Sequence, residues 1–155
     1  DSDYQLLQKD TDSIYLAISA QKFEDIIKED MREQYEKEKH KWFVCNAFDR
    51  RTPGLFKIEW EGDAMVSLNS KCYYCYAENN KDKLSSKGIQ KSNNLRMEDY
   101  KNVLFNKENK MCVNRGFRVK ENSVMTYESN KIGLTPFYAK RKVLADGITT
   151  EPLDI

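Results

Sequence analysis

The segment LLQKDTDSIYLAI, residues Leu6–Ile18, decides the fold, because a short polar stretch separates two runs that have the composition of β-strands. The runs Tyr4–Gln8 and Ile14–Ile18 are rich in aliphatic, aromatic and β-branched residues, which favour strands. Between them, Asp10-Thr11-Asp12-Ser13 consists of turn formers. The sequence therefore predicts a β-hairpin whose tip carries two aspartates.

The two aspartates of this tip make it a candidate metal site. Asp10 and Asp12 are two positions apart, so at a tight turn their carboxylates can converge on one Mg²⁺ ion, which a single carboxylate holds poorly. The alternative is an Asx turn, in which the side chains bond only to the local backbone. An EF-hand loop is excluded, because Tyr15 and Gln21 stand where that loop needs glycine and glutamate.

Length and composition fit one packed domain, or a domain with a smaller appendage. The chain has 155 residues, of which 39% are hydrophobic and 33% are charged. No apolar run approaches the ~20 residues of a membrane span, and no signal peptide is visible. We expect an intracellular protein, nuclear or cytoplasmic, with no membrane partner. Because the first residue is Asp1 and not methionine, we also expect this chain to be part of a longer protein.

Charge is distributed unevenly along the chain. The net charge is +1, but residues 1–40 contain 6 Lys+Arg and 11 Asp+Glu, so the front is net −5 and the remainder is net +6. An acidic front and a basic remainder are typical of a protein that holds cations at one place and a polyanion at another. Ordinary solvated faces are the alternative explanation.

The four cysteines allow two disulfides or one zinc site: Cys45, Cys72, Cys75 and Cys112. The pair Cys72 and Cys75 has the spacing of a zinc knuckle. However, the two tyrosines between them favour an extended strand, in which positions i and i+3 point to opposite faces. We therefore expect reduced thiols, most of them packed in the interior.

The chain after the hairpin predicts an α+β fold. Apolar residues recur at three- and four-residue steps over Gln21–Lys41, with Ser19 as N-cap, which predicts one long helix covering the back of the hairpin. The runs Leu55–Glu61, Ala64–Asn69 and Lys71–Ala77 then predict an antiparallel meander. In its last strand, alternation places Lys71, Tyr73 and Cys75 on one face. An ordinary exposed strand face is the alternative for this lysine and phenol.

The second half of the chain is mixed and basic. The polar segment Glu78–Asn94 contains Ser85-Ser86-Lys87-Gly88, whose lysine and backbone amides suit phosphate binding, with a solvated loop as the alternative. A short helix is predicted over Met97–Asn106, with Met97, Tyr100, Val103 and Leu104 facing inward. Strands are predicted over two runs, followed by a basic segment and an extended tail: Arg115–Lys120, Val124–Tyr127, Leu134–Leu144 and Gly147–Ile155.

Several of these motifs together resemble family B DNA polymerases. Asp10-Thr11-Asp12-Ser13 between two strands is similar to their third catalytic motif, and Lys71-Cys72-Tyr73 is similar to their Lys-x-Tyr motif. The wider sequence resembles the protein-primed polymerases of the Polinton or Maverick DNA transposons over nearly the whole chain. This similarity includes four further segments: Thr52–Lys57, Glu59–Gly62, Lys83–Gly88 and Tyr138–Lys142. The chain departs from the family at Gln8, where a tyrosine is usual, but keeps both carboxylates.

The resemblance implies a DNA-directed DNA polymerase that transfers nucleotides to a primer 3′ hydroxyl with two Mg²⁺ ions. It implies that Asp12 is the direct metal ligand and Asp10 a second, less essential one. The neighbouring hydroxyls of Thr11 and Ser13 would lie at the nucleotide. It further implies that three residues bind primer-template DNA, with Lys71 on a backbone phosphate and Tyr73 against the primer end: Lys71, Tyr73 and Lys87.

The resemblance covers only part of such an enzyme. Residues 1–77 correspond to the C-terminal part of an antiparallel palm sheet with its catalytic hairpin, and residues 78–155 to a small mixed thumb-like subdomain. The earlier motif that brings another essential aspartate does not occur, and neither does the nucleotide-binding motif of the fingers. The expected partners are primer-template DNA, deoxynucleoside triphosphates, and the remainder of the palm and fingers. We expect the isolated chain to bind DNA weakly and not to polymerise.

Two other functions compete with this one. The first is a noncatalytic nucleic-acid-binding module with a basic sheet, in which the Asp pair is only a turn. The second is an interaction domain that binds no nucleic acid, even at low salt where phosphate contacts are strongest.

Overall fold

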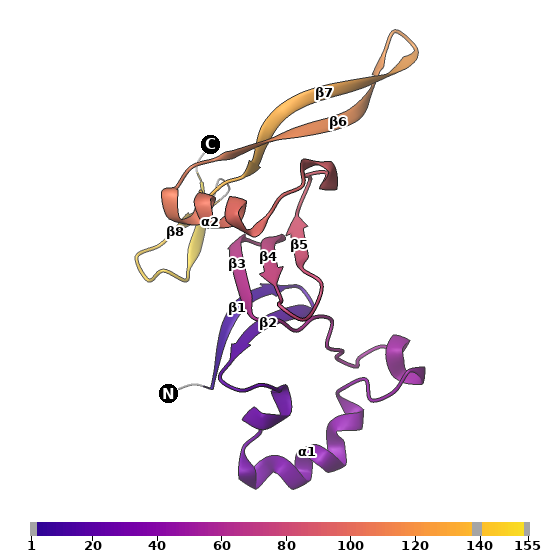
Figure 1. The fold of residues 1–155 in the computed structure, drawn as a ribbon, viewed down its shortest axis with the longest axis vertical. Helices are drawn as coiled ribbons and strands as arrows, with labels where there is room; N and C mark the ends of the chain where they lie inside the picture. The colour runs from indigo at the N-terminus through magenta and orange to yellow at the C-terminus, as the bar shows by residue number, and fades with distance from the viewer. Residues whose placement is uncertain (1–2, 138–140, 154–155) are drawn as a thin grey trace. The chain divides into compact units, whose positions relative to one another are not determined.

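A computed structural model describes residues 3–137 and 141–153 and divides the chain into two compact units, Asp1–Glu61 and Gly62–Ile155 (Figure 1). The boundary follows Glu61, before the predicted strand Ala64–Asn69. The division predicted after residue 77 would instead follow the predicted strand Lys71–Ala77. A cut after residue 77 would separate strands that pair with each other. The assignment of palm and thumb to these parts stays a prediction.

The predicted hairpin opens the first unit. Strands β1 (Tyr4–Asp10) and β2 (Ser13–Ile18) pair antiparallel, with Asp10 opposite Ser13, so the tip is a two-residue turn. Thr11, the first residue of that turn, has a φ of 55°, a value that tight hairpin turns require at this position. This confirms the hairpin predicted from Leu6–Ile18.

The long helix predicted over Gln21–Lys41 is wrong. The segment forms short helical pieces: η1 (Phe23–Ile26), η2 (Glu29–Met31), α1 (Arg32–Glu38) and η3 (Lys39–Lys41). Ile27 and Lys28 are extended, with ψ values of 125° and 142°. The helix is therefore interrupted at the pair Ile26-Ile27, whose β-branched side chains are less favourable in helices. The Ser19 hydroxyl does not cap a helix but donates to the carbonyl of Asp3 at the open end of the hairpin.

Among the described residues of the first unit, no helix covers the hairpin. Leu6, Ile14 and Leu16 on its strands all remain exposed. The helical pieces instead gather around Phe43, whose ring lies 5.6 Å from that of Phe23 and 6.2 Å from that of Phe56. Between Leu55 and Glu61, where a strand was predicted, the structure has only an isolated bridge from Phe56 to Phe43. A further short helix, η4, spans Phe48–Arg51.

The second unit begins with a three-stranded antiparallel sheet in the order β3 (Ala64–Asn69), β4 (Cys72–Tyr76) and β5 (Lys83–Ser86). An antiparallel meander is present, and two of its predicted strands are β3 and β4. The predicted first strand, Leu55–Glu61, is not part of it, and β5 is the additional strand. β5 belongs to the polar segment Glu78–Asn94, where no strand was predicted. Leu84 is the only apolar residue of β5, so only pairing with β4 identifies it as a strand.

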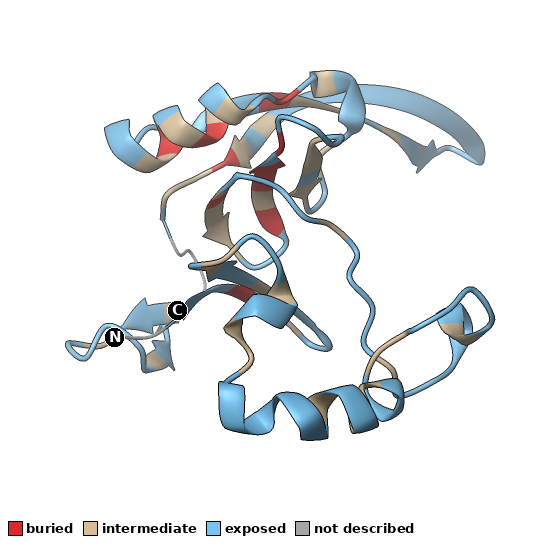
Figure 2. Ribbon diagram, turned by 60° about the horizontal axis from the view of Figure 1, so that its bottom comes forward, coloured by how far each residue is buried: buried red, intermediate tan, exposed pale blue. Residues whose placement is uncertain are grey.

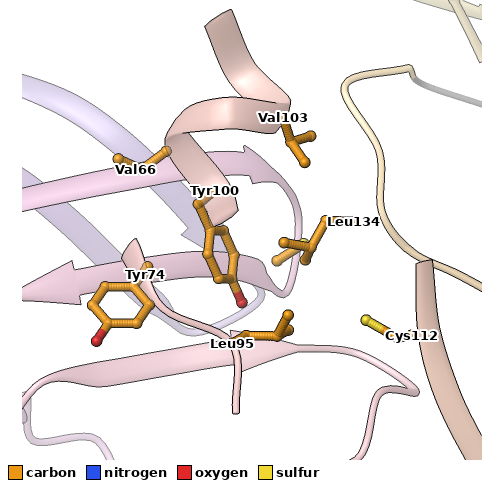
Figure 3. Packing of buried hydrophobic residues seen from close by; sticks show 8 residues of the cluster. Val66, Tyr74, Leu95, Tyr100, Val103, Cys112 and Leu134 are labelled. Carbon is orange, nitrogen blue, oxygen red and sulfur yellow. The ribbon is translucent and has the colours of Figure 1, made fainter. Parts of the chain in front are cut away.

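The main core of the second unit lies between this sheet and helix α2 (Met97–Asn106), which follows the short helix η5 (Lys91–Asn93). Figure 2 shows the buried positions concentrated on β3, β4 and α2, and Figure 3 shows their side chains meeting. The inward face predicted for α2 is confirmed, because Tyr100 and Val103 are buried and their neighbours pack against the cluster. The buried members are Val66, Cys72, Tyr74, Leu95, Tyr100, Val103, Cys112 and Leu134.

Two hairpins complete the chain. The strands β6 (Lys110–Lys120) and β7 (Ser123–Leu134) form a long two-stranded ribbon, joined by a turn in which Glu121 and Asn122 both have positive φ. The strands predicted here are confirmed and extend further than expected. The strands β8 (Arg141–Val143) and β9 (Thr150–Pro152) pair with each other, so the predicted tail is partly a hairpin. Residues 138–140 of the basic segment lie outside the described residues.

The fold is therefore a mixed α+β arrangement of small antiparallel sheets. All four cysteines are free thiols, and the predicted packing is confirmed for Cys72, Cys75 and Cys112, which are buried, whereas Cys45 is exposed. Burial raises the pKa of Cys72 and of Cys75 to about 11, so both stay protonated at neutral pH. None of the helices in the described ranges combines the length and apolar character that a membrane crossing requires.

Candidate functional site

The two aspartates lie at the hairpin tip in different environments. Asp12 is the second residue of the turn and is exposed, whereas Asp10, the last residue of β1, is half-buried. Two hydroxyls hold Asp10 in place: Thr11 Oγ1 donates to Asp10 Oδ1 at 3.3 Å, and Ser13 Oγ donates to the Asp10 carbonyl at 3.1 Å. The tip thus presents one carboxylate to solvent beside another that the turn itself positions.

These hydrogen bonds bear on the roles predicted for Thr11 and Ser13. Both hydroxyls are directed at Asp10, so their first role is to brace the turn. Contact of Thr11 and Ser13 with a nucleotide stays a prediction.

The donor set at the tip fits part of a magnesium site. Carboxylate oxygens are the ligands that Mg²⁺ prefers, and this ion usually binds through one or two carboxylates together with water and phosphate oxygens. Asp10 and Asp12 supply that number. Within the described ranges, no group of three or more His, Cys, Asp and Glu side chains is arranged to hold a metal ion. A two-metal site built on this tip needs a further carboxylate from elsewhere.

The three predicted DNA-binding residues come together at one end of the sheet β3–β4–β5. The carbonyl of Lys71 accepts the backbone N–H of Lys87 at 3.1 Å and the hydroxyl of Ser85 at 3.0 Å. Tyr73 is paired directly with Ser85 across the two strands. The structure therefore brings the backbone positions of Lys71, Tyr73 and Lys87 to the same end of the sheet, although Lys87 is distant from the other two in the sequence.

The position of Lys71 differs from the one predicted. Strand β4 begins at Cys72, and Lys71 lies in the preceding turn with a φ of 61°. It is exposed, whereas Tyr73 is half-buried and Cys75, predicted on the same face, is fully buried. The predicted shared face is therefore wrong for Lys71, because a turn residue does not follow the alternation of the strand.

A further lysine lies at this place that sequence reasoning missed. Lys131 of β7 donates from Nζ to the carbonyl of Gly88 at 2.6 Å, directly beside Lys87. The two partners are 43 residues apart, and no local pattern relates them. These backbone and side-chain bonds bring Lys71, Lys87 and Lys131 to the same end of the sheet, and we call these three residues the lysine cluster.

Asp82 lies before β5, at the opposite end of that strand from Lys87, and has a structural partner. Asp82 accepts the hydroxyl of Tyr74 at 2.7 Å, and this bond raises the pKa of Tyr74 to about 12. Tyr100 donates to the carbonyl of Ser85 at 3.1 Å, and burial raises its pKa further. Both phenols therefore stay protonated and anchor the sheet.

The acidic tip belongs to the unit Asp1–Glu61 and the lysine cluster to the unit Gly62–Ile155. Each is formed within its own unit, and a common groove for Asp12 and Lys71 stays a prediction. Comparison with protein-family models, with curated proteins and with solved structures finds no significant match to this chain.

Proposed function

We propose that this chain is a C-terminal palm and thumb portion of a family B DNA polymerase, acting in magnesium-dependent nucleotidyl transfer to a primer 3′ hydroxyl. The observation that carries the proposal is the hairpin tip, where an exposed Asp12 stands beside a braced Asp10 between two paired strands. This is the strand–turn–strand setting that the Asp-Thr-Asp-Ser motif requires.

In this proposal Asp12 is the direct metal ligand, because its carboxylate is exposed. Asp10 is a second ligand, oriented by the hydroxyls of Thr11 and Ser13. Bound Mg²⁺ activates the attacking hydroxyl and neutralises charge on the triphosphate and the leaving pyrophosphate. Since such a site needs a carboxylate beyond these two, the remainder of the palm and the fingers supply it together with the nucleotide-binding residues.

The lysine cluster has the second role in the proposal. Lys71 and Lys87 bind phosphates of the primer-template, and Tyr73 lies against the primer end. Such contacts position the strand without reading its bases. Lys71 and Lys87 lie in turns at the end of β4 and β5, and the bonds from the Lys87 N–H and the Ser85 hydroxyl to the Lys71 carbonyl hold these turns together.

The same cluster supports the second candidate, a noncatalytic nucleic-acid-binding module. Lys131 adds a cation beside Lys87 that the polymerase motifs do not require. The two functions differ at Asp12, because only the first gives that residue a role.

The test is metal binding at the tip. With Mn²⁺ as a paramagnetic substitute for Mg²⁺, we expect the amide NMR signals of Thr11 and Ser13 to broaden, and the broadening to be lost in Asp12→Ala. Asp30→Ala, which removes another exposed carboxylate of the same unit, is the matched control and should leave it unchanged. In the longer polymerase, Asp12→Ala should abolish primer extension while duplex binding stays nearly constant. Equal broadening in Asp12→Ala would contradict the proposal.

A further inference from the structure

The outer edge of strand β6 is covered over part of its length by two side-chain amides. Gln90 donates from Nε2 to the carbonyl of Arg115 at 2.7 Å and accepts the N–H of Arg115 at 3.0 Å. Asn93 does the same for Val113, at 2.9 Å and 2.7 Å. Each amide thus bonds as a residue of a neighbouring strand would, and the backbone groups of Val113 and Arg115 point away from β7.

The same edge continues without this cover. In an antiparallel pair every second residue turns its N–H and carbonyl outward, so the next outward positions after Arg115 are Phe117 and Val119. Within the described ranges, no hydrogen bond to these backbone groups is present on that side. The side chains of Phe117 and Val119 are 78% and 73% exposed. Four backbone groups in line, with two large apolar side chains, form an open strand edge.

The two faces of the ribbon differ in chemistry beyond Arg115. Phe117 and Val119 share one face with Val124 of β7, which is 71% exposed, so this face is apolar. Arg118 and Lys120 share the opposite face, where the Arg118 guanidinium lies 5.7 Å from the centre of the Tyr127 ring. An open hollow of about 590 Å³ borders Gln90 and the ribbon at Phe117 and Tyr127.

We propose that this edge of β6 binds an extended peptide segment of another protein, in which apolar residues alternate with acidic ones. A strand added here continues both faces of the ribbon. Its residues beside Phe117 and Val119 lie on the apolar face, and its residues beside Arg118 and Lys120 lie on the cationic face. The binding site ends at Arg115, because the side-chain amides of Gln90 and Asn93 already bond to the outward backbone groups of Arg115 and Val113. This inference does not depend on the proposed function.

Charge complementarity selects this occupant over a second copy of the chain. Two β6 edges would bring Arg118 and Lys120 of each copy together, and cations on an edge strand oppose such pairing. The edge of β7 offers no equivalent site for an acidic strand, because no lysine or arginine occurs from Ser123 to Asn130 and Glu128 lies there.

The test uses the full chain and a labelled peptide of sequence Val-Glu-Val-Glu-Val-Glu-Val, followed by fluorescence anisotropy. Val119→Pro removes one outward N–H and leaves the ladder to β7 intact, so we expect affinity to fall by about tenfold or more. Val124→Pro makes the same change at the directly paired residue on the other edge, and affinity should stay within about twofold. Circular dichroism checks that both variants fold.

Charge reversal provides a second variant that keeps the backbone unchanged. Arg118→Glu should lower the affinity for the acidic peptide. It should raise the affinity for a peptide in which lysine replaces every glutamate. On binding of the acidic peptide to the unchanged chain, the amides of Phe117 and Val119 should become protected from hydrogen exchange. Three results would overturn the proposal: equal effects of the two proline variants, equal affinity for the two peptides, or a concentration-dependent dimer that Val119→Pro abolishes. An equal loss of affinity for duplex DNA in Val119→Pro would also overturn it, because the edge would then bind DNA.

Discussion

Gln90 and Arg115 are joined by two hydrogen bonds between a side-chain amide and a backbone, although they are 25 residues apart. The pair fastens the base of the β6–β7 ribbon to the segment that follows β5. Asn93 makes the same two hydrogen bonds to the backbone of Val113, so four hydrogen bonds in all hold this edge of β6.

Replacing this amide tests how firmly the ribbon is held. Gln90→Ala removes two hydrogen bonds at an exposed site, so we expect the free energy of unfolding to fall by about 1 kcal/mol. The amide of Arg115 should exchange faster with solvent. Urea denaturation and hydrogen exchange measure the two effects. Asn102→Ala on the exposed side of α2 is the control, and a similar loss there would show that the effect is not specific to the ribbon.

The core between α2 and the sheet determines the stability of the second unit. Leu134 is fully buried, so Leu134→Ala should lower the free energy of unfolding by about 3 kcal/mol through lost burial and a cavity. Phe105→Ala on the same core helix α2, at a side chain that is 74% exposed, should change it by less than about 0.5 kcal/mol. Thermal denaturation of both variants checks this, and comparable losses would contradict the assigned core.

The thiols should differ sharply in reactivity. Cys45 is exposed, whereas burial raises the pKa of Cys72 and Cys75 to about 11 and also raises that of Cys112. At pH 8 a thiol reagent should therefore modify Cys45 rapidly and the other three only after unfolding. Mass spectrometry of the modified peptides identifies the sites. Rapid modification of Cys72 in the folded chain would contradict its burial in the core cluster.

Acid should destabilise the second unit through Asp99. Burial alone would raise the pKa of Asp99, but the hydrogen bonds from Lys110 and from the backbone N–H of Arg96 outweigh it and lower the pKa. A carboxylate with a lowered folded-state pKa stabilises the fold above its unfolded value, near 4, and this stability is lost as pH falls through the folded value.

Thermal denaturation of the chain between pH 2 and pH 6 measures this dependence. Asp99→Asn keeps a hydrogen-bond acceptor but not the charge, so its unfolding temperature should fall less steeply in acid. Asp30→Asn, at an exposed aspartate, should retain the slope of the unchanged chain. An identical slope for Asp99→Asn would show that the pair with Lys110 contributes nothing.

Under the proposed function, salt should weaken DNA binding in proportion to the phosphates contacted. Lys87→Ala in the lysine cluster should lower the slope of log K against log salt by about 0.9, the contribution of one phosphate contact. Lys37→Ala in α1 should leave it unchanged. Fluorescence anisotropy with a short primer-template, over a range of salt concentrations, gives both slopes. Equal slopes for Lys87→Ala and the unchanged chain would remove Lys87 from the interface.

Local pattern was sufficient for those elements whose own sequence carries the full signal. The hairpin at Leu6–Ile18 was predictable because turn formers separate two strand-forming runs. Helix α2 and its inward residues were predictable because Met97, Tyr100, Val103 and Leu104 follow the period of a helix. The long helix over Gln21–Lys41 had the same periodicity, but Ile27 and Lys28 are extended, and periodicity alone does not register such a break.

The sequence by itself thus determined the hairpin with its two aspartates, the helix α2 and the burial of most thiols. Only the tertiary structure decided that the polar segment Lys83–Ser86 is a strand, that Lys131 joins Lys87, and that Gln90 covers Arg115. The physical reason is that these contacts join residues far apart in the chain. Strand pairing and hydrogen bonds from side-chain amides depend on which segments of the chain come into contact. The types of the residues alone do not determine those contacts.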